Sequence, residues 1–125
     1  MFLGIIGGKD SYLEKFVLED INSNSEYFTQ FIGPSTFINQ DFVSVYYFGK
    51  AGWSLCRHRF GVLNELYLDL QSEGYTDIKM IGVNGYAYIS NDYHCMVCDT
   101  PDECSSCDEV RVLPWVQDVP SYFNP

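Results

Sequence analysis

The chain has 125 residues, of which 46% are hydrophobic and 17% aromatic, so its composition is that of a folded protein rather than a disordered one. This length suits one domain with a core of its own. Acidic residues outnumber basic ones by seventeen to seven, and the formal net charge is -10 at pH 7. Because such a surface repels phosphate groups, we expect neither nucleic acid nor an anionic membrane as a partner.

The N-terminal segment, MFLGIIGGKD, has no basic stretch followed by a long apolar one. We therefore expect neither a signal peptide nor a transmembrane helix there. From Asp10 to about Ile21, apolar residues recur at helical spacing after a Ser11 and Glu14 pair that is typical of a capping box. This pattern predicts an amphipathic helix.

The central part of the chain predicts a strand, a helix and a second strand. Phe42–Phe48 is a continuous apolar and aromatic run with the length and composition of a strand buried on both faces. After a glycine-containing loop, apolar residues recur every three or four positions, and Gly74 is a typical helix stop. Ile78–Val83 predicts the second strand. The three elements together predict a right-handed βαβ unit with parallel strands.

Cys56 lies where the first predicted strand gives way to the helix. The positive end of the helix dipole favours thiolate over thiol, and the cationic groups of Arg57, His58 and Arg59 also favour it. A reactive cysteine fits this position. A buried cysteine acting as a small hydrophobic residue fits it as well, since most lone cysteines are structural. The residues alone leave both interpretations open.

Four short sequences in and after the βαβ unit belong together. They are Trp53-Ser54-Leu55-Cys56 at the start of the helix, Glu73-Gly74-Tyr75 at its end, Val83-Asn84 after the second strand, and LPWVQD at Leu113–Asp118. The first three resemble the active-site unit of the thioredoxin-like superfamily, and within it the selenoprotein P type, whose motif is selenocysteine-x-x-Cys. The fourth resembles an LPxxQD segment of several redox proteins in that superfamily. The resemblance implies a thioredoxin-like α/β fold and a redox activity.

The residue at the first redox position departs from this pattern. The resemblance places the redox nucleophile at Trp53 and the resolving thiol at Cys56, but an indole cannot attack a disulfide or a peroxide. Because selenocysteine is encoded by UGA, which some translation schemes read as tryptophan, we hypothesise that Trp53 is a misread selenocysteine. A UGG codon would refute this hypothesis. The alternative is a genuine tryptophan that fills the loop, which leaves Cys56 without a redox partner.

A cysteine-rich segment over residues 91–109, which we expect to be an insertion, contains two C-x-x-C pairs. Two such pairs can bind one tetrahedral metal ion, with zinc as the first candidate, an iron–sulfur site as a weaker one and His94 as a spare ligand. Against zinc, the five-residue spacer is short and the acidic neighbours disfavour four close thiolates. Two disulfides are the alternative, and four cysteines allow three pairings. The four candidate ligands are Cys95, Cys98, Cys104 and Cys107.

The remaining elements are weaker predictions. Asn84-Gly85 before Tyr86–Ile89 is a hairpin signal, whereas the resemblance implies a loop; we expect the loop, because the next stretch is irregular. Val110–Leu113 predicts a short strand that Pro114 ends. A full thioredoxin-like domain would continue with a β-hairpin and a helix. We therefore expect residues 1–125 to form a single, C-terminally incomplete domain of that type.

The sequence thus predicts an α/β protein with a thioredoxin-like βαβ core that reduces disulfides or peroxides through position 53 and Cys56. The alternative function is a non-catalytic thioredoxin-like binding module with a zinc- or disulfide-stabilised insertion. Neither a phosphate-binding glycine loop nor a Ser-His-Asp arrangement is present in the pattern. The reductant, the compartment and the oligomeric state do not follow from the sequence.

Overall fold

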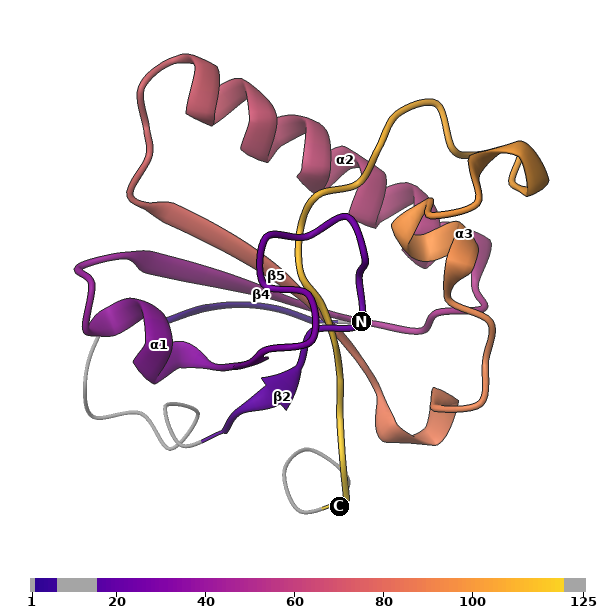
Figure 1. Cartoon of the computed structure of the whole chain (residues 1–125), viewed down its shortest axis with the longest axis horizontal. Helices are drawn as coiled ribbons and strands as arrows, with labels where there is room; N and C mark the ends of the chain where they lie inside the picture. Colours follow the sequence, from indigo (N-terminus) through magenta and orange to yellow (C-terminus); the bar gives the residue numbers. More distant parts are fainter. Residues whose placement is uncertain (1, 7–15, 121–125) are drawn as a thin grey trace.

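The computed structural model describes residues 2–6 and 16–120, with side chains from residue 16 onward. Its main feature is a four-stranded sheet in the order β1-β4-β5-β6. Strands β4, β5 and β6 run parallel, and β1 is antiparallel to β4 (Figure 1). The chain is therefore a mixed α/β protein, as predicted. The strands are β1 (Phe2–Ile6), β4 (Val43–Gly49), β5 (Ile78–Asn84) and β6 (Trp115–Gln117).

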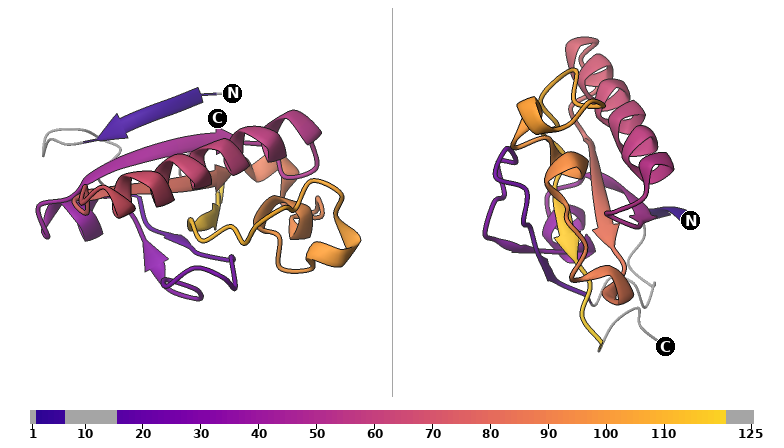
Figure 2. Two further views of the ribbon diagram at one scale, coloured as in Figure 1. Left: turned by 90° about the horizontal axis from the view of Figure 1, so that it is seen from above. Right: turned by 90° about the vertical axis from the view of Figure 1, so that its right-hand side faces the viewer.

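The other elements cover the two faces of this sheet. A long helix, α2, lies over one face, and the segment from residue 16 to 38 lies over the opposite face (Figure 2). That segment includes a small antiparallel ribbon, β2-β3. Among the described residues, no helix is both long and apolar enough to cross a membrane. These elements are β2 (Leu18–Glu19), β3 (Phe31–Ile32), α1 (Pro34–Ile38), α2 (Ser54–Ser72), η2 (Tyr86–Tyr88), α3 (His94–Val97) and η3 (Pro101–Glu103).

The predicted strand, helix and strand are confirmed as β4, α2 and β5. The two strands pair in parallel along their full lengths, from Val43 opposite Ile78 to Gly49 opposite Asn84. Gly74 follows α2 with a φ of +94°, a left-handed conformation that glycine adopts without steric cost. The helix therefore ends close to the residue that the sequence marked as its stop.

Alternating residues of the central strands divide the core into two layers. Tyr46, Ile81 and Val116 pack with the segment from residue 16 to 38. Their neighbours Tyr47, Met80 and Trp115 pack with α2 on the other face. Such alternation is expected of strands buried on both faces.

A close packing of rings on the α2 side depends on Gly82 of β5. The ring centroids of Phe60 and Trp115 lie 5.1 Å apart, nearly edge to face. A Cβ atom at Gly82 would overlap both rings. Glycine is therefore required here by the close approach of two aromatic side chains to the strand.

The predicted N-terminal helix is wrong over residues 16–21, and its first part, residues 10–15, lies outside the described residues. Phe16, Leu18 and Asp20 are buried while Val17 and Glu19 are exposed. This period of two is that of a strand, and Leu18–Glu19 forms β2. These residues are extended because they pair with β3 and with Val116 of β6, although the spacing of their apolar residues is helical.

The strand predicted at Val110–Leu113 is also wrong, since the strand lies at Trp115–Gln117. Pro114 accepts a hydrogen bond from Gly82 through its carbonyl, but it has no N–H with which to extend the ladder towards earlier residues. The backbone of residues 110–112 forms hydrogen bonds with the side chain of Asn64 instead. That side chain accepts the N–H of Val112 at 2.8 Å and donates to the carbonyl of Val110 at 3.1 Å.

The predicted loop after β5 is confirmed. Gly85 leads into the 3₁₀ turn η2, and the N–H of Tyr88 returns to the carbonyl of Gly85 at 2.9 Å. The hairpin alternative is therefore excluded for these residues. The turn brings Tyr88 beside Lys50, whose ammonium nitrogen lies 5.0 Å from the centroid of that ring.

Candidate functional site

The C-terminal ends of β4, β5 and β6 lie at one edge of the sheet, next to the start of α2. Ligand and catalytic sites of parallel α/β sheets form at this edge. Asn84, buried at the end of β5, joins the segments there. Its side-chain oxygen accepts the N–H of Ala51 at 3.0 Å, and its amide donates to the carbonyl of Tyr88 at 3.1 Å and to the side chain of Gln117 at 2.7 Å. The loop before α2 is thus held to β5 and β6 by one amide.

Trp53 is the N-cap residue of α2 and is 46% exposed. Its carbonyl accepts the N–H of Arg57 at 3.0 Å, which closes the first turn of the helix. The position therefore lies in solvent at the positive end of a 19-residue helix, where an anionic nucleophile would be stabilised. The indole that occupies it has no nucleophilic chemistry.

Cys56 lies in the first turn of α2, as predicted, and is completely buried at 0% exposure. The backbone N–H of Lys50 donates to its Sγ at 3.4 Å. The Tyr47 hydroxyl donates to its carbonyl at 3.5 Å. Burial, followed by the neighbouring Cys56 side chain, raises the pKa of Tyr47 above its ordinary value, so this phenol stays protonated at neutral pH. The fold therefore encloses this thiol away from solvent, and its chemical role stays a prediction.

The cationic residues after Cys56 do not form one cluster around its sulfur. Arg57 donates from its Nε to the carbonyl of Ala51 at 3.3 Å, so its guanidinium lies against the loop before α2. His58 and Arg59 are exposed on the helix. Of the three, Arg57 is the residue with a hydrogen bond to the loop before α2, while the charge of Arg59 acts on Tyr47, whose hydroxyl bonds the Cys56 carbonyl.

The four cysteines of the segment over residues 91–109 form two disulfides, so the structure has the disulfide alternative. Each bridge joins one C-x-x-C pair to the other. In this oxidised form the four predicted zinc ligands bond to one another and present no thiolates. In the described part of the chain, no group of three or more His, Cys, Asp or Glu residues is placed to hold a metal ion. The bridges are Cys95–Cys104 and Cys98–Cys107, with Cα–Cα distances of 5.5 and 5.6 Å.

His94, predicted as a spare metal ligand, has another partner in the structure. Its Nδ1 lies 2.8 Å from a carboxylate oxygen of Asp99. The hydrogen bond with Asp99 raises the pKa of His94 above its ordinary value, and the charge of the same carboxylate adds to the effect. His94 is therefore part of a surface ion pair when it is protonated.

The cysteine segment packs against the start of α2. Met96 and Val97 of α3 are fully buried in the same apolar cluster as Cys56. Arg111, 5% exposed, donates hydrogen bonds to the carbonyls of Arg57 at 2.7 Å, Met96 at 3.0 Å and Ser106 at 3.3 Å. One guanidinium therefore joins α2 to both halves of the cysteine segment.

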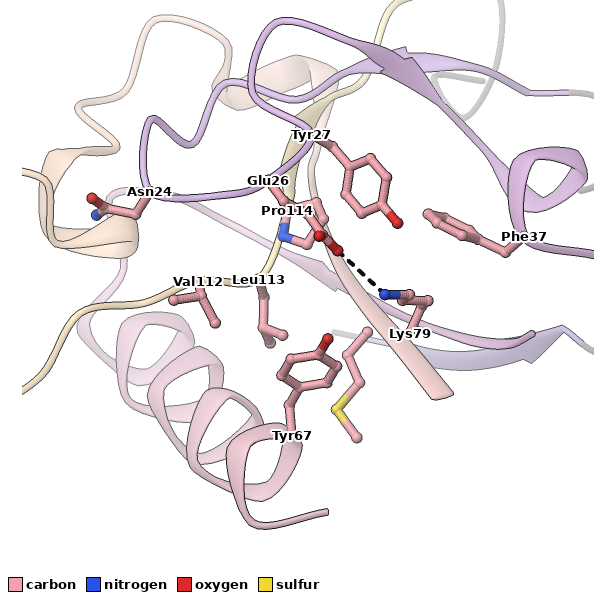
Figure 3. A pocket seen from close by; sticks show the side chains of 10 residues that line it. Asn24, Glu26, Tyr27, Phe37, Tyr67, Lys79, Val112, Leu113 and Pro114 are labelled. Carbon is pink, nitrogen blue, oxygen red and sulfur yellow. Dashed lines mark hydrogen bonds and ion pairs between the residues drawn. The ribbon is translucent and has the colours of Figure 1, made fainter. Parts of the chain in front are cut away.

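A pocket of about 300 Å³ lies beside the first half of β5 and was not expected from the sequence (Figure 3). Lys79 lines it, with its ammonium nitrogen 3.2 Å from Glu26 and 4.9 and 5.8 Å from the ring centroids of Phe42 and Tyr27. The ladder between β5 and β6 starts only at Gly82, which leaves room for this pocket. The one signal in the sequence was a single lysine within an apolar strand.

A scan against protein-family models, a search of curated proteins and a search of solved structures each found no match. The α/β architecture therefore rests on the structure of this chain alone. The more specific thioredoxin-like assignment enters as a proposal.

Proposed function

We propose that this chain is a thioredoxin-like redox protein that reduces disulfides or peroxides through a selenol or thiol at position 53, with Cys56 as the resolving thiol. One observation carries the proposal. Position 53 is exposed at the N-cap of α2, and Cys56 is fully buried one turn further along the same helix. An exposed nucleophile and a protected resolving thiol need this arrangement, because substrate must reach the first group and must not reach the second.

The chemistry follows from these two positions. The ionised group at position 53 attacks one sulfur of a substrate disulfide, and the other sulfur leaves as a thiolate. Cys56 then loses its proton and attacks the mixed intermediate, which releases the second substrate thiolate. The product is a bond between position 53 and Cys56, which a dithiol reductant reopens. The N–H of Lys50 that bonds Cys56 Sγ supports its thiolate form during this step.

The first test has two parts, the identity of the codon for position 53 and the redox activity of a Trp53→Cys variant. A UGA codon at position 53 supports the proposal directly. For the protein with tryptophan, we expect Trp53→Cys to form an internal disulfide with Cys56, since an N-cap residue and one three positions later lie within disulfide reach. This variant should reduce insulin disulfides, or turn over a hydroperoxide, at least about 10²-fold above Trp53→Ser, in line with the value of a positioned reactive group.

The matched control adds Cys56→Ser to Trp53→Cys. Loss of turnover in this double variant shows that Cys56 resolves the intermediate. If Trp53→Cys forms no bond with Cys56, or if activity survives in the double variant, the proposed redox pair is incorrect.

A second candidate function is a non-catalytic thioredoxin-like binding module with a disulfide-stabilised segment. The observation that favours it is the exposure of large apolar side chains: Trp53 is 46% exposed, and Leu55, Val62 and Leu66 on one face of α2 are 38%, 50% and 45% exposed. Exposed apolar patches mark interaction surfaces. A UGG codon, together with an inert chain in both redox assays, would favour this candidate over the first.

A further inference from the structure

We propose that the segment over residues 91–109 is a redox-switched metal site. When its two disulfides are reduced, the four thiolates of the segment bind one zinc ion, or a divalent ion of the same tetrahedral, sulfur-preferring class. Oxidation to the observed disulfides releases the ion. This site lies outside the proposed redox pair, because it uses neither position 53 nor Cys56. Its ligands are Cys95, Cys98, Cys104 and Cys107.

The backbone places each of the four cysteines close to two others. Across the two pairs, the Cα atoms joined by each bridge lie 5.5 and 5.6 Å apart. Within the first pair, Cys95 and Cys98 share the turn of α3. Within the second, the N–H of Cys107 bonds the carbonyl of Cys104 at 3.2 Å. Residues three apart in such turns have Cβ atoms about 5–6 Å apart, so the four positions form a compact quadrilateral.

The sulfur atoms of one bridge lie beside the backbone of the other bridge. The Sγ atoms of Cys98 and Cys107 both lie 3.8 Å from the carbonyl oxygen of Cys95. One bridge therefore lies against the backbone that carries the other. A zinc–sulfur distance of about 2.3 Å requires sulfurs about 3.8 Å apart in a tetrahedron, which is too far for a bond between them. The disulfides and the metal site are for this reason mutually exclusive states.

The two C-x-x-C turns are also held together by groups other than the bridges. Arg111 donates to the carbonyl of Met96, inside the first pair, and to the carbonyl of Ser106, inside the second. The amide of Asn24 donates to the carbonyl of Val97 at 3.2 Å. Met96 and Val97 are fully buried. We expect these contacts to hold the turns in place when the disulfides are opened, although the segment then loses the stabilisation of its cross-links.

The positive charge of Arg111 favours the metal-bound form of the cysteine segment. Four thiolates around one divalent ion carry a net charge of −2. Arg111 is buried, and within the described residues no carboxylate lies within 4.0 Å of its guanidinium. Burial lowers the pKa of Arg111 below its ordinary value, although the more distant carboxylates of Glu109, Asp108 and Glu65 raise it. A buried cation gains from a nearby anion, and the tetrathiolate supplies one that the neutral disulfides do not.

The switch balances in electrons and protons. Each disulfide takes two electrons and two protons from a dithiol reductant, which itself becomes a disulfide. Binding of the divalent ion then displaces the four thiol protons. In the reverse direction, two molecules of a disulfide oxidant accept four electrons, the two bridges reform and the ion leaves. Cys95 and Cys107 are only half buried, so a reductant can approach one sulfur of each bridge.

The experiment uses the full chain, reduced without oxygen by a phosphine, which offers no competing thiol. We expect the reduced chain to bind one Co²⁺ with the visible absorption of a tetrahedral tetrathiolate, and Zn²⁺ to displace it. The untreated chain should bind none. A reduced chain without that absorption, or an untreated chain that binds as well, would overturn the proposal.

Two variants and one further measurement complete the test. Cys104→Ser with Cys107→Ser should weaken Co²⁺ binding at least about 10²-fold, since two of four ligands are lost. The matched control His94→Gln should keep both spectrum and affinity, and a changed spectrum would refute the four-thiolate ligand set. The near-ultraviolet circular dichroism of the reduced, metal-loaded chain should keep the aromatic signal that the packed core of the untreated chain gives. If metal binds only when that signal is absent, the site does not belong to the folded protein.

Discussion

Two regions of this molecule carry its sulfur chemistry, and the fold holds them in opposite ways. Cys56 at the start of α2 is surrounded by apolar residues, and among the described residues it is the one cysteine outside a disulfide. The four cysteines over residues 91–109 are held by covalent bridges and by two polar side chains, Asn24 from the distant N-terminal part of the chain and Arg111 just after the segment. Stability of the first region therefore depends on packing, and stability of the second depends on its redox state in addition to the packing of Met96 and Val97.

The two regions should therefore be destabilised by different kinds of substitution. A packed apolar site loses free energy in proportion to the volume removed from it. The cysteine segment packs only Met96 and Val97 into the same apolar cluster as Cys56, and it depends further on cross-links that restrict its unfolded state and on hydrogen bonds that satisfy buried carbonyls. Substitutions in the two regions should therefore differ in the free energy of unfolding that they remove.

The largest effect should follow replacement of all four bridged cysteines by alanine. Each bridge closes a loop with a sequence separation of 9, and loss of both should lower the free energy of unfolding by about 4 kcal/mol. Urea unfolding of the variant and of the intact chain measures this difference. A loss no larger than that of Cys56→Ala would show that the bridges do not stabilise the segment.

Arg111→Gln should come next, with a loss of about 3 kcal/mol in the free energy of unfolding. The change removes three hydrogen bonds to backbone carbonyls in a buried setting. His58→Gln, on the exposed face of α2, is the control and should cost less than about 0.5 kcal/mol. Equal losses in the two variants would contradict the role assigned to Arg111.

Cys56→Ala should lower the free energy of unfolding by about 1 kcal/mol, because only one buried sulfur atom is removed from a packed core. In the intact chain, a maleimide reagent should label Cys56 no faster than the local structure opens, and labelling should accelerate as urea is added. Rapid labelling in the absence of urea would show that this thiol is open to solvent.

The smallest effect concerns His94 and its partner Asp99. Because the folded-state pKa of His94 is raised, the pair stabilises the protein fully below the ordinary histidine pKa, and that contribution is lost as pH rises through the folded-state pKa. His94 is about half exposed, so solvent screens the pair and the change should stay below about 0.5 kcal/mol. An NMR titration should show the pKa of His94 falling in Asp99→Asn, and an unchanged value would contradict the assignment.

The βαβ unit could be predicted from the sequence because the patterns that indicate it lie within short stretches of neighbouring residues. The apolar run that forms β4, the helical spacing within α2 and the glycine after that helix each act over a few residues, and the structure follows them to within one or two positions. The same local evidence placed Cys56 in the first turn of the helix and Trp53 just before it.

Tertiary structure decided what depends on partners far apart in the sequence. Residues 16–21 became extended because Leu18 pairs with Ile32 and Asp20 bridges to Val116. The strand near the C-terminus formed after Pro114 because a residue without an N–H cannot extend the ladder towards earlier residues. Spacing alone allowed three cysteine pairings, and the choice among them required the packing of α3 and the contacts of Arg111. The full burial of Cys56 beside an exposed Trp53 likewise depends on side chains that only the folded chain brings together.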